Sequence, residues 1–155
     1  MRVLQRVPLI LPLVAALAAG CGSDTIGPND LTIDDLVGTW TVTKLEYTSD
    51  ANRGTSKDLI KDNGATGTIT VNANGTYTYT LTAPGPISQT TTGTFTVQNG
   101  SVIDSPTGQA QHTTTVTRTG DTITIVDESV TFDFDNNPNT PPTGADLTTV
   151  WQKQS

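Results

Sequence analysis

Apolar residues recur at every second position along most of the chain from residue 38 onward, and threonine fills many of the positions between them. A period of two indicates β-strands that bury one face, and β-branched threonine suits the exposed face of such strands. Strands are predicted at 38–48, 67–72, 76–82, 89–98, 101–104, 111–119, 122–127, 129–135 and 146–153. Helical spacing is nearly absent from this region. The pattern therefore predicts an all-β fold.

The connections between several of these strands contain residues that suit tight reversals. Asn74-Gly75, Asn99-Gly100 and Gly120-Asp121 tolerate the positive φ angles that two-residue hairpins require. Consecutive strands are therefore expected to pair in sequence order. The result is an antiparallel meander that closes into a β-barrel of eight or nine strands.

The first predicted strand changes phase partway along. Trp40 and Val42 share one face, whereas Leu45 and Tyr47 share the other. This change predicts a bulge or bend near residues 43–44, because an extra residue moves the following side chains to the opposite face. Bent strands of this kind are what the closure of a barrel requires.

The inward positions of the strands are expected to form a single core. They are Trp40, Val42, Ile69, Val71, Tyr77, Tyr79, Leu81, Phe95, Val97, Val102, Val116, Ile123, Ile125, Val130, Phe132, Phe134, Leu147 and Trp151. Burial of each apolar side chain contributes roughly 1.5–3 kcal/mol, which is enough to hold one domain of this size.

The start of the chain has a different composition. Arg2 and Arg6 precede an apolar run at 7–19, and the small residues 18–20 precede Cys21, the only cysteine. This layout predicts a secretory signal peptide, and the run is shorter than the ~20 residues of a membrane-spanning helix. The segment resembles the lipobox of bacterial lipoproteins, which implies that Cys21 carries lipid. The alternative is an ordinary signal peptide that is cleaved elsewhere and leaves an incidental thiol.

The chain is accordingly divided into three segments. Residues 1–20 are the predicted lipoprotein signal peptide, and 21–30 are a small, polar stretch that suits a flexible tether. Residues 31–155 have the length of one domain and form the predicted barrel. Gly22, in place of aspartate, resembles lipoprotein cargo sent to an outer membrane. The expected location is therefore the cell envelope, with lipid anchoring in the outer membrane.

Charge and cysteine content limit the partners. Without the two arginines of the leader, six basic residues face fifteen acidic ones, a net charge of −9. This balance disfavours nucleic acid and anionic headgroups, so membrane attachment is expected through the lipid alone. A single cysteine forms no intramolecular disulfide and no cysteine-based zinc site. The protein is expected to be a monomer.

The segment 31–40, which reads Leu-Thr-Ile-Asp-Asp-Leu-Val-Gly-Thr-Trp, resembles the opening of lipocalin-like domains. In that family a short helical turn leads into a first strand marked Gly-x-Trp, here Gly38 to Trp40. The hairpin at 74–77, the Gly-Thr-Phe strand at 93–95 and the end of the last strand at 150–153 are similar to bacterial members. The resemblance implies a meander barrel that binds or carries a small apolar ligand.

Two features depart from the family pattern. The Thr-Asp-Tyr motif of lipocalins is missing. The arginine that covers the first-strand tryptophan in that family has two candidate counterparts here, Lys153 and Arg118.

A barrel of this size either encloses a small ligand or fills with side chains. The connection 49–65 is longer than most hairpin loops, contains a candidate short helix at 56–60, and resembles the lid of a lipocalin mouth. In the binding hypothesis the pocket is closed and lined by Leu59, Ile60, Tyr77, Tyr79, Phe95, Phe132 and Phe134. In the alternative these side chains fill the core, and the outer face contacts a protein or an envelope component.

The loop 133–139 alternates Asp and Asn side chains, as the start of a calcium loop does. Pro138 stands where that loop needs glycine, and Gly144 stands where it needs glutamate. A polar hairpin loop is therefore the preferred interpretation, with calcium binding left open.

Catalytic patterns are weak. His112, the only histidine, shares a strand face with Val116 and is expected to be half-exposed. Paired carboxylates occur at 127–128 and at 34–35. Adjacent residues of a strand point to opposite faces, so neither pair is expected to converge on a substrate. Neither a Gly-x-Ser-x-Gly turn nor a phosphate-binding glycine loop is present. The sequence predicts a non-catalytic protein without metal or cofactor.

Overall fold

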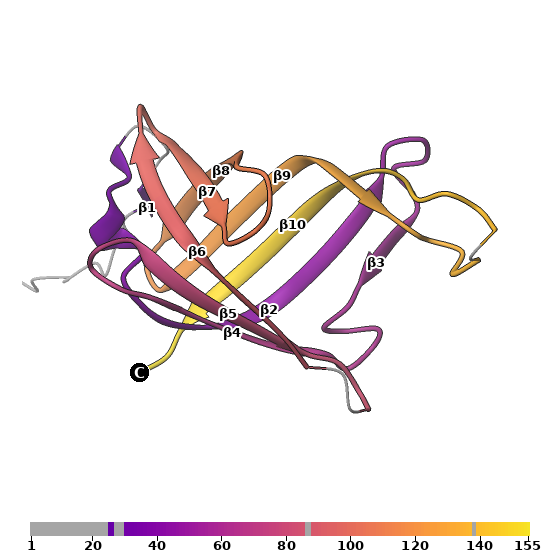
Figure 1. Cartoon of the computed structure of the whole chain (residues 1–155), viewed down its shortest axis with the longest axis horizontal. Helices are drawn as coiled ribbons and strands as arrows, with labels where there is room; N and C mark the ends of the chain where they lie inside the picture. The colour runs from indigo at the N-terminus through magenta and orange to yellow at the C-terminus, as the bar shows by residue number, and fades with distance from the viewer. Residues whose placement is uncertain (1–24, 27–29, 86–87, 138) are drawn as a thin grey trace, which may run out of the picture.

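The alternation of apolar and polar residues gives eight long antiparallel strands in the computed structural model, which describes residues 25–26, 30–85, 88–137 and 139–155. The strands are β2 (Gly38–Ser49), β4 (Thr66–Val71), β5 (Thr76–Thr82), β6 (Ser88–Gln98), β7 (Ser101–Pro106), β8 (His112–Thr119), β9 (Thr122–Phe132) and β10 (Thr143–Lys153). Each strand pairs with the next along the chain, and β10 also pairs with β2, which closes a barrel (Figure 1). The predicted antiparallel meander barrel is confirmed.

Three short elements lie outside this circuit: β1 (Thr25–Ile26), the 3-10 turn η2 (Ile33–Asp35) and β3 (Ser56–Asp58). The strand β1 pairs with Arg118 and Thr119 of β8, beyond the part of β8 that pairs with β7. Of the predicted tether 21–30, the structure describes residues 25–26 and 30, and Ile26 packs against the core cluster. Cys21 and the predicted signal peptide lie outside the described residues.

The helix predicted at 56–60 is wrong. Residues Ser56–Asp58 form β3, which pairs with the part of β2 that β4 does not reach. The carboxylate of Asp58 accepts hydrogen bonds from the backbone nitrogens of Leu45, Ile60 and Lys61, at 3.2, 3.0 and 3.3 Å. A side chain that binds nearby backbone amides in this way competes with helix formation.

The two strands predicted at 122–127 and 129–135 form the single strand β9. The pairing of β9 with β10 shifts register between Ala145 and Leu147, so an irregularity in the ladder absorbs the break in the apolar pattern. Residues after Phe132 leave the strand and enter a loop.

The predicted bulge in the first strand is confirmed. Val150 of β10 lies opposite Lys44, whereas the next residue, Trp151, lies opposite Val42. Thr43 is therefore the extra residue, and its Oγ1 donates a hydrogen bond to the carbonyl oxygen of Val150 at 3.3 Å. Because of this bulge, residues on both sides of it are buried, including Leu45.

The core occupies the interior of the barrel. Its largest fully buried side chains are Trp40, Leu36, Ile69, Ile123, Val71, Val102 and Val116. Val130, Phe132 and Phe134, which were predicted to face inward, lie outside the core cluster because they belong to the end of β9 and the loop after it. Among the described residues, no helix has the length and apolar character needed to cross a membrane.

Candidate functional site

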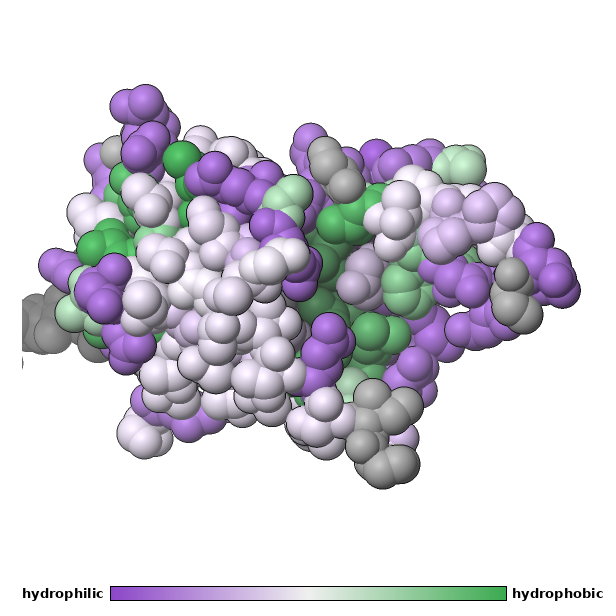
Figure 2. Space-filling model, in the orientation of Figure 1, coloured by the Kyte–Doolittle hydropathy of each residue, from purple (hydrophilic) through white to green (hydrophobic). Residues whose placement is uncertain are grey.

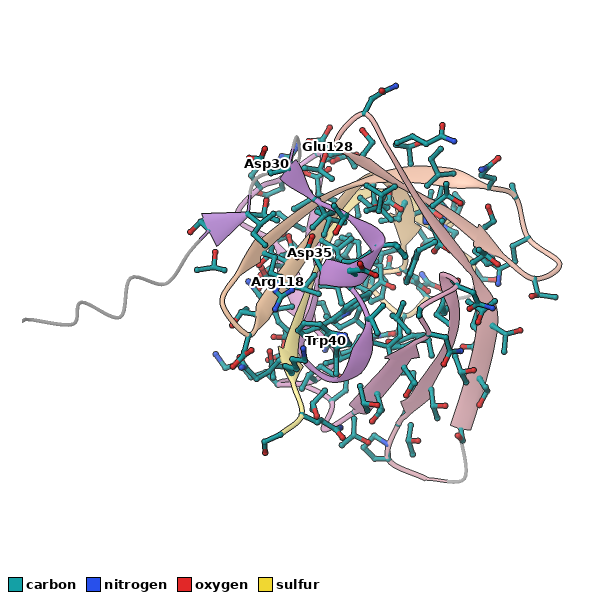
Figure 3. The ribbon with its side chains drawn as sticks, turned by 90° about the vertical axis from the view of Figure 1, so that its left-hand side faces the viewer. Asp30, Asp35, Trp40, Arg118 and Glu128 are labelled. Carbon is teal, nitrogen blue, oxygen red and sulfur yellow. The ribbon has the colours of Figure 1, made fainter. Side chains whose placement is uncertain are left out.

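One end of the barrel is closed by η2. Leu36, which follows this turn, is only 1% exposed and belongs to the core cluster. The backbone nitrogen and Oγ1 of Thr32 both donate hydrogen bonds to Oδ2 of Asp35, at 2.9 and 2.7 Å, and so hold the turn in place. Figure 3 looks onto this end and shows Asp35, Arg118 and Trp40 lying near one another.

Trp40 is completely buried at the closed end. Its Nε1 donates a hydrogen bond to the carbonyl oxygen of Leu36 at 2.8 Å. The Cζ of Arg118 lies 5.9 Å from the centroid of the Trp40 ring, and the Nζ of Lys153 lies 5.5 Å from it. Both candidate cations therefore contact the first-strand tryptophan at cation–π distance.

Arg118 also joins β8 to η2. Its Nη1 donates to the backbone oxygen and to Oδ1 of Asp35, at 3.0 and 3.2 Å. Burial raises the pKa of Asp35, but the hydrogen bonds from Thr32 and the charge of Arg118 outweigh burial, so the pKa is lowered overall. The carboxylate of Asp35 is thus stabilised in its ionised form.

The Gly-x-Trp motif has a backbone explanation. Gly38 has φ +135°, a conformation that residues with a side chain rarely adopt. A Cβ at this position would also lie 3.4 Å from Cε of Lys153 and 3.8 Å from Nε1 of Trp40. Glycine at the first position of β2 therefore allows the backbone to lie close to the side chains of Trp40 and Lys153.

A cavity of about 360 Å³ lies in the rest of the barrel interior. Its apolar and aromatic lining consists of Leu45, Tyr47, Ile69, Tyr77, Tyr79, Leu81, Phe95, Pro106, Ile125, Leu147 and Trp151. Its polar lining consists of Gln89, Thr91, Asp104, Gln109, His112, Thr114, Asp127 and Thr149. In Figure 2 this face of the molecule is hollowed, and apolar residues are exposed in the hollow.

Three neighbouring strands contribute ionisable side chains to one side of this cavity. Asp104 of β7, His112 of β8 and Asp127 of β9 form what we call the charged wall. The Nε2 of His112 lies 3.6 Å from Oδ2 of Asp104 and 3.4 Å from Oδ2 of Asp127. Asp104 and His112 are brought together because they are directly paired in the β7–β8 ladder.

Tyr77 fixes one of these carboxylates. Its hydroxyl donates a hydrogen bond to Oδ1 of Asp104 at 2.9 Å, and its ring stacks on that of Phe95 with the centroids 4.3 Å apart. Gly93 makes room for this arrangement, because a Cβ there would lie 2.7 Å from the Tyr77 hydroxyl. Burial, followed by the hydrogen bond to Asp104, raises the pKa of Tyr77.

Burial also dominates the electrostatics of Asp104. It raises the pKa of this carboxyl, and the nearby charge of Asp127 acts in the same direction. The hydrogen bond from Tyr77 and the proximity of His112 act in the opposite direction but do not cancel the effect. Burial in the cavity wall therefore disfavours the ionised form of Asp104.

Two polar atoms inside the barrel have no hydrogen-bond partner among the described residues. They are the hydroxyl oxygen of Tyr79 and Nε1 of Trp151, and both side chains line the cavity. Burial raises the pKa of Tyr79 to about 12, so its hydroxyl keeps its proton at neutral pH. Buried polar groups in folded proteins nearly always have a partner, so these two atoms are exceptions within this interior.

The seven predicted pocket residues lie in different places. Tyr77, Tyr79 and Phe95 line the cavity. Leu59 and Ile60 instead pack against the core cluster, directly after β3, which pairs with β2.

The remaining two, Phe132 and Phe134, lie around a separate hollow of about 100 Å³. Phe132 does not line the cavity, but its ring stacks on that of Tyr47, which does. The two ring centroids lie 4.1 Å apart. The role of all seven residues in ligand binding stays a prediction.

The oxygens of the 133–139 loop are used within the loop itself. The backbone nitrogen of Asp135 donates to Oδ1 of Asp133 at 3.2 Å, and that of Asn137 donates to Oδ1 of Asp135 at 2.9 Å. The backbone nitrogen of Asn139 donates to Oδ1 of Asn137 at 3.1 Å. Across the part of the chain that the structure describes, no group of three or more His, Cys, Asp or Glu side chains is placed to hold a metal ion.

The charged wall was not predicted from the sequence, although a signal was present. Asp104 follows Val102 on the inward face of β7, and Asp127 follows Ile125 on the inward face of β9. Carboxylates that continue an inward apolar alternation face the interior. Residues 127 and 128 differ in orientation as predicted, because only Asp127 lines the cavity, where it meets His112 of β8.

Comparison with known proteins gives one match. A family model described as a lipocalin-like domain matches residues 36–125, which is more than half of the chain. No curated protein and no solved structure matches the chain significantly.

Proposed function

Because this chain belongs to the family of lipocalin-like domains, we propose that it binds or carries a small, largely apolar molecule inside its barrel and is not an enzyme. Members of this family are generally non-catalytic binding proteins. The observation that carries the proposal is the cavity of about 360 Å³, with its mostly aromatic and aliphatic lining. Ligand pockets commonly measure about 300–1,000 Å³ and have this kind of lining.

The competing proposal, a filled domain that acts only through its outer face, fits this interior less well. A filled barrel would pack side chains against one another at the density of an organic crystal. Here polar and apolar side chains instead surround a cavity of about 360 Å³.

The chemistry of the charged wall supports binding better than catalysis. A serine or cysteine nucleophile needs a base beside it. The Nε2 of His112 instead lies beside the carboxylates of Asp104 and Asp127. Such a group attracts and orients a polar ligand.

A cavity-filling variant tests the binding proposal. Thr149 lines the cavity at the middle of β10, so Thr149→Phe should occupy part of the space and weaken binding of the neutral apolar probe N-phenyl-1-naphthylamine by roughly tenfold or more. Probe fluorescence, titrated into the full-length protein, gives the affinity. Native mass spectrometry of the unmodified protein, purified from its own host, would reveal a natural occupant.

The matched control is Thr148→Phe, because Thr148 neighbours Thr149 on β10 and does not line the cavity. Adjacent residues of a strand face opposite sides. If both folded variants bound the probe as the wild type does, the cavity would not be the binding site.

We propose separately that the protein is a lipoprotein of the cell envelope, anchored in the outer membrane through Cys21. The proposal is supported by the basic and apolar leader and by the small residues before Cys21. The net charge of −9 after the leader leaves the lipid as the means of attachment. Partners other than the membrane and the ligand are not proposed.

Metabolic labelling with radioactive palmitate tests this anchor. The wild type should incorporate label and fractionate with the outer membrane, and Cys21→Ser should lose both properties. Label retained in Cys21→Ser would show that the lipid, if any, is attached elsewhere.

A further inference from the structure

The charged wall gives the cavity a polarity that an entirely apolar ligand would not need. The side chains of Asp104 and Asp127 are only 17% and 14% exposed, and that of His112 is 41% exposed. Among the residues that the structure describes, no lysine or arginine lines the cavity. With both carboxylates ionised, the wall is therefore negative whether His112 is neutral or protonated.

Burying two carboxylates beside a cavity opposes folding unless a positive or hydrogen-bonding group meets them. The fold supplies Asp104 with one hydrogen bond from Tyr77 and places the imidazole of His112 between the two acids. Both carboxylates line a space that an occupant can enter.

The rest of the lining suits the same kind of occupant. The side chains of Tyr47, Tyr79 and Trp151 also line the cavity, and aromatic faces attract cations as well as apolar bodies.

Trp151 is only 4% exposed, and its Nε1 has no partner among the described residues. The buried hydroxyl of Tyr79 has none there either. The indole N–H can only donate, whereas a tyrosine hydroxyl can also accept a hydrogen bond from a donor such as ammonium.

We propose that the cavity binds a small amphiphilic amine, with its ammonium group against Asp104 and Asp127 and its apolar body against the aromatic lining. This inference rests on the proposed binding function and specifies the ligand class. A bare metal ion fits less well, because the described residues contain no cluster of three or more ligating side chains placed to hold one.

Three probes that share one ring system and differ in head group test the inference. They are 2-(2-naphthyl)ethylamine, 2-(2-naphthyl)ethanol and 2-naphthylacetic acid. Isothermal titration calorimetry with the full-length protein at neutral pH should show the amine binding roughly tenfold more tightly than the alcohol. This is the factor expected from one charge-assisted hydrogen bond. The acid should bind most weakly.

Variants of the charged wall identify the source of this preference. Asp104→Asn and Asp127→Asn should each weaken binding of the amine by about tenfold and leave binding of the alcohol nearly unchanged. Glu128→Gln is the matched control, because Glu128 neighbours Asp127, is exposed, and does not line the cavity. It removes the same charge from the surface and should leave all three affinities unchanged.

The outcomes separate the two proposals. Equal affinity for amine and alcohol would overturn the amine inference and leave the binding function standing. An amine preference that survives in both aspartate variants would overturn it as well. If none of the three probes bound, and N-phenyl-1-naphthylamine also failed to bind, the binding function itself would fail.

Discussion

Asp104 lies in the interior wall of the barrel with a raised pKa, held by one hydrogen bond from Tyr77. A group whose pKa is higher in the folded than in the unfolded state binds its proton more tightly when folded. Its contribution to stability is therefore complete below its ordinary pKa of 3.8 and is lost as the pH rises through the raised value. At neutral pH the ionised carboxylate opposes folding.

This linkage predicts that Asp104→Asn is at least as stable as the wild type at neutral pH, by up to about 1 kcal/mol. The amide keeps an oxygen that can accept from Tyr77 and removes the charge. The free energy of unfolding from urea titrations should fall less between pH 4 and pH 7 in the variant than in the wild type.

An exposed aspartate in a turn provides the comparison for this measurement. Asp121→Asn should leave the same pH dependence unchanged, because Asp121 is exposed at the β8–β9 turn. If Asp104→Asn followed the wild-type curve across this range, burial of the Asp104 charge would not be a cause of the pH dependence.

At the scale of elements, η2 is a short turn that is stabilised from outside itself. Three residues cannot form a stable helix alone. Thr32 holds Asp35 from one side and Arg118 of β8 holds it from the other, while Leu36 inserts into the core. The closed end of the barrel therefore depends strongly on one carboxylate.

We predict that Asp35→Asn lowers the free energy of unfolding by about 1–2 kcal/mol at neutral pH. Because the pKa of Asp35 is lowered in the folded state, its contribution is present above its ordinary value of 3.8 and is lost as the pH falls through the lowered value. The difference between variant and wild type should therefore shrink in acid. Denaturant unfolding at several pH values measures it.

Asp34→Asn is the matched variant, since Asp34 lies in the same turn and is exposed. It should change stability by no more than a few tenths of a kcal/mol. An equal loss in both variants would mean that general charge at the turn, and not the contacts of Asp35, stabilises the closed end.

At the scale of the whole molecule, the barrel was predictable because its pattern is local. Alternation along each strand, turn residues between strands and the phase change near Thr43 are all properties of short segments, and they determine a meander in which neighbours pair in order. The Gly38 to Trp40 motif was predictable for the same reason.

The features that were missed depend on contacts between distant segments. The pairing of β3 with β2 replaced a helix at 56–60 because a free strand edge was available, which no local pattern reveals. The charged wall joins three strands, and recognising it requires the register between Asp104 and His112 as well as the inward phase of Asp127.

The short strand β1 has a consequence for how the protein meets a surface. It pairs with Arg118 at the closed end of the barrel, where η2 lies. Figure 1 shows β1 and η2 on the side opposite the loop between β9 and β10. The polypeptide thus enters the barrel far from its opening. A bilayer, bead or sensor chip joined through residues before β1 would face the closed end and leave the opening directed into solvent. Under the proposed function, a ligand would then be exchanged through water or with a docked donor, and immobilisation by the N-terminal side would leave the opening unobstructed.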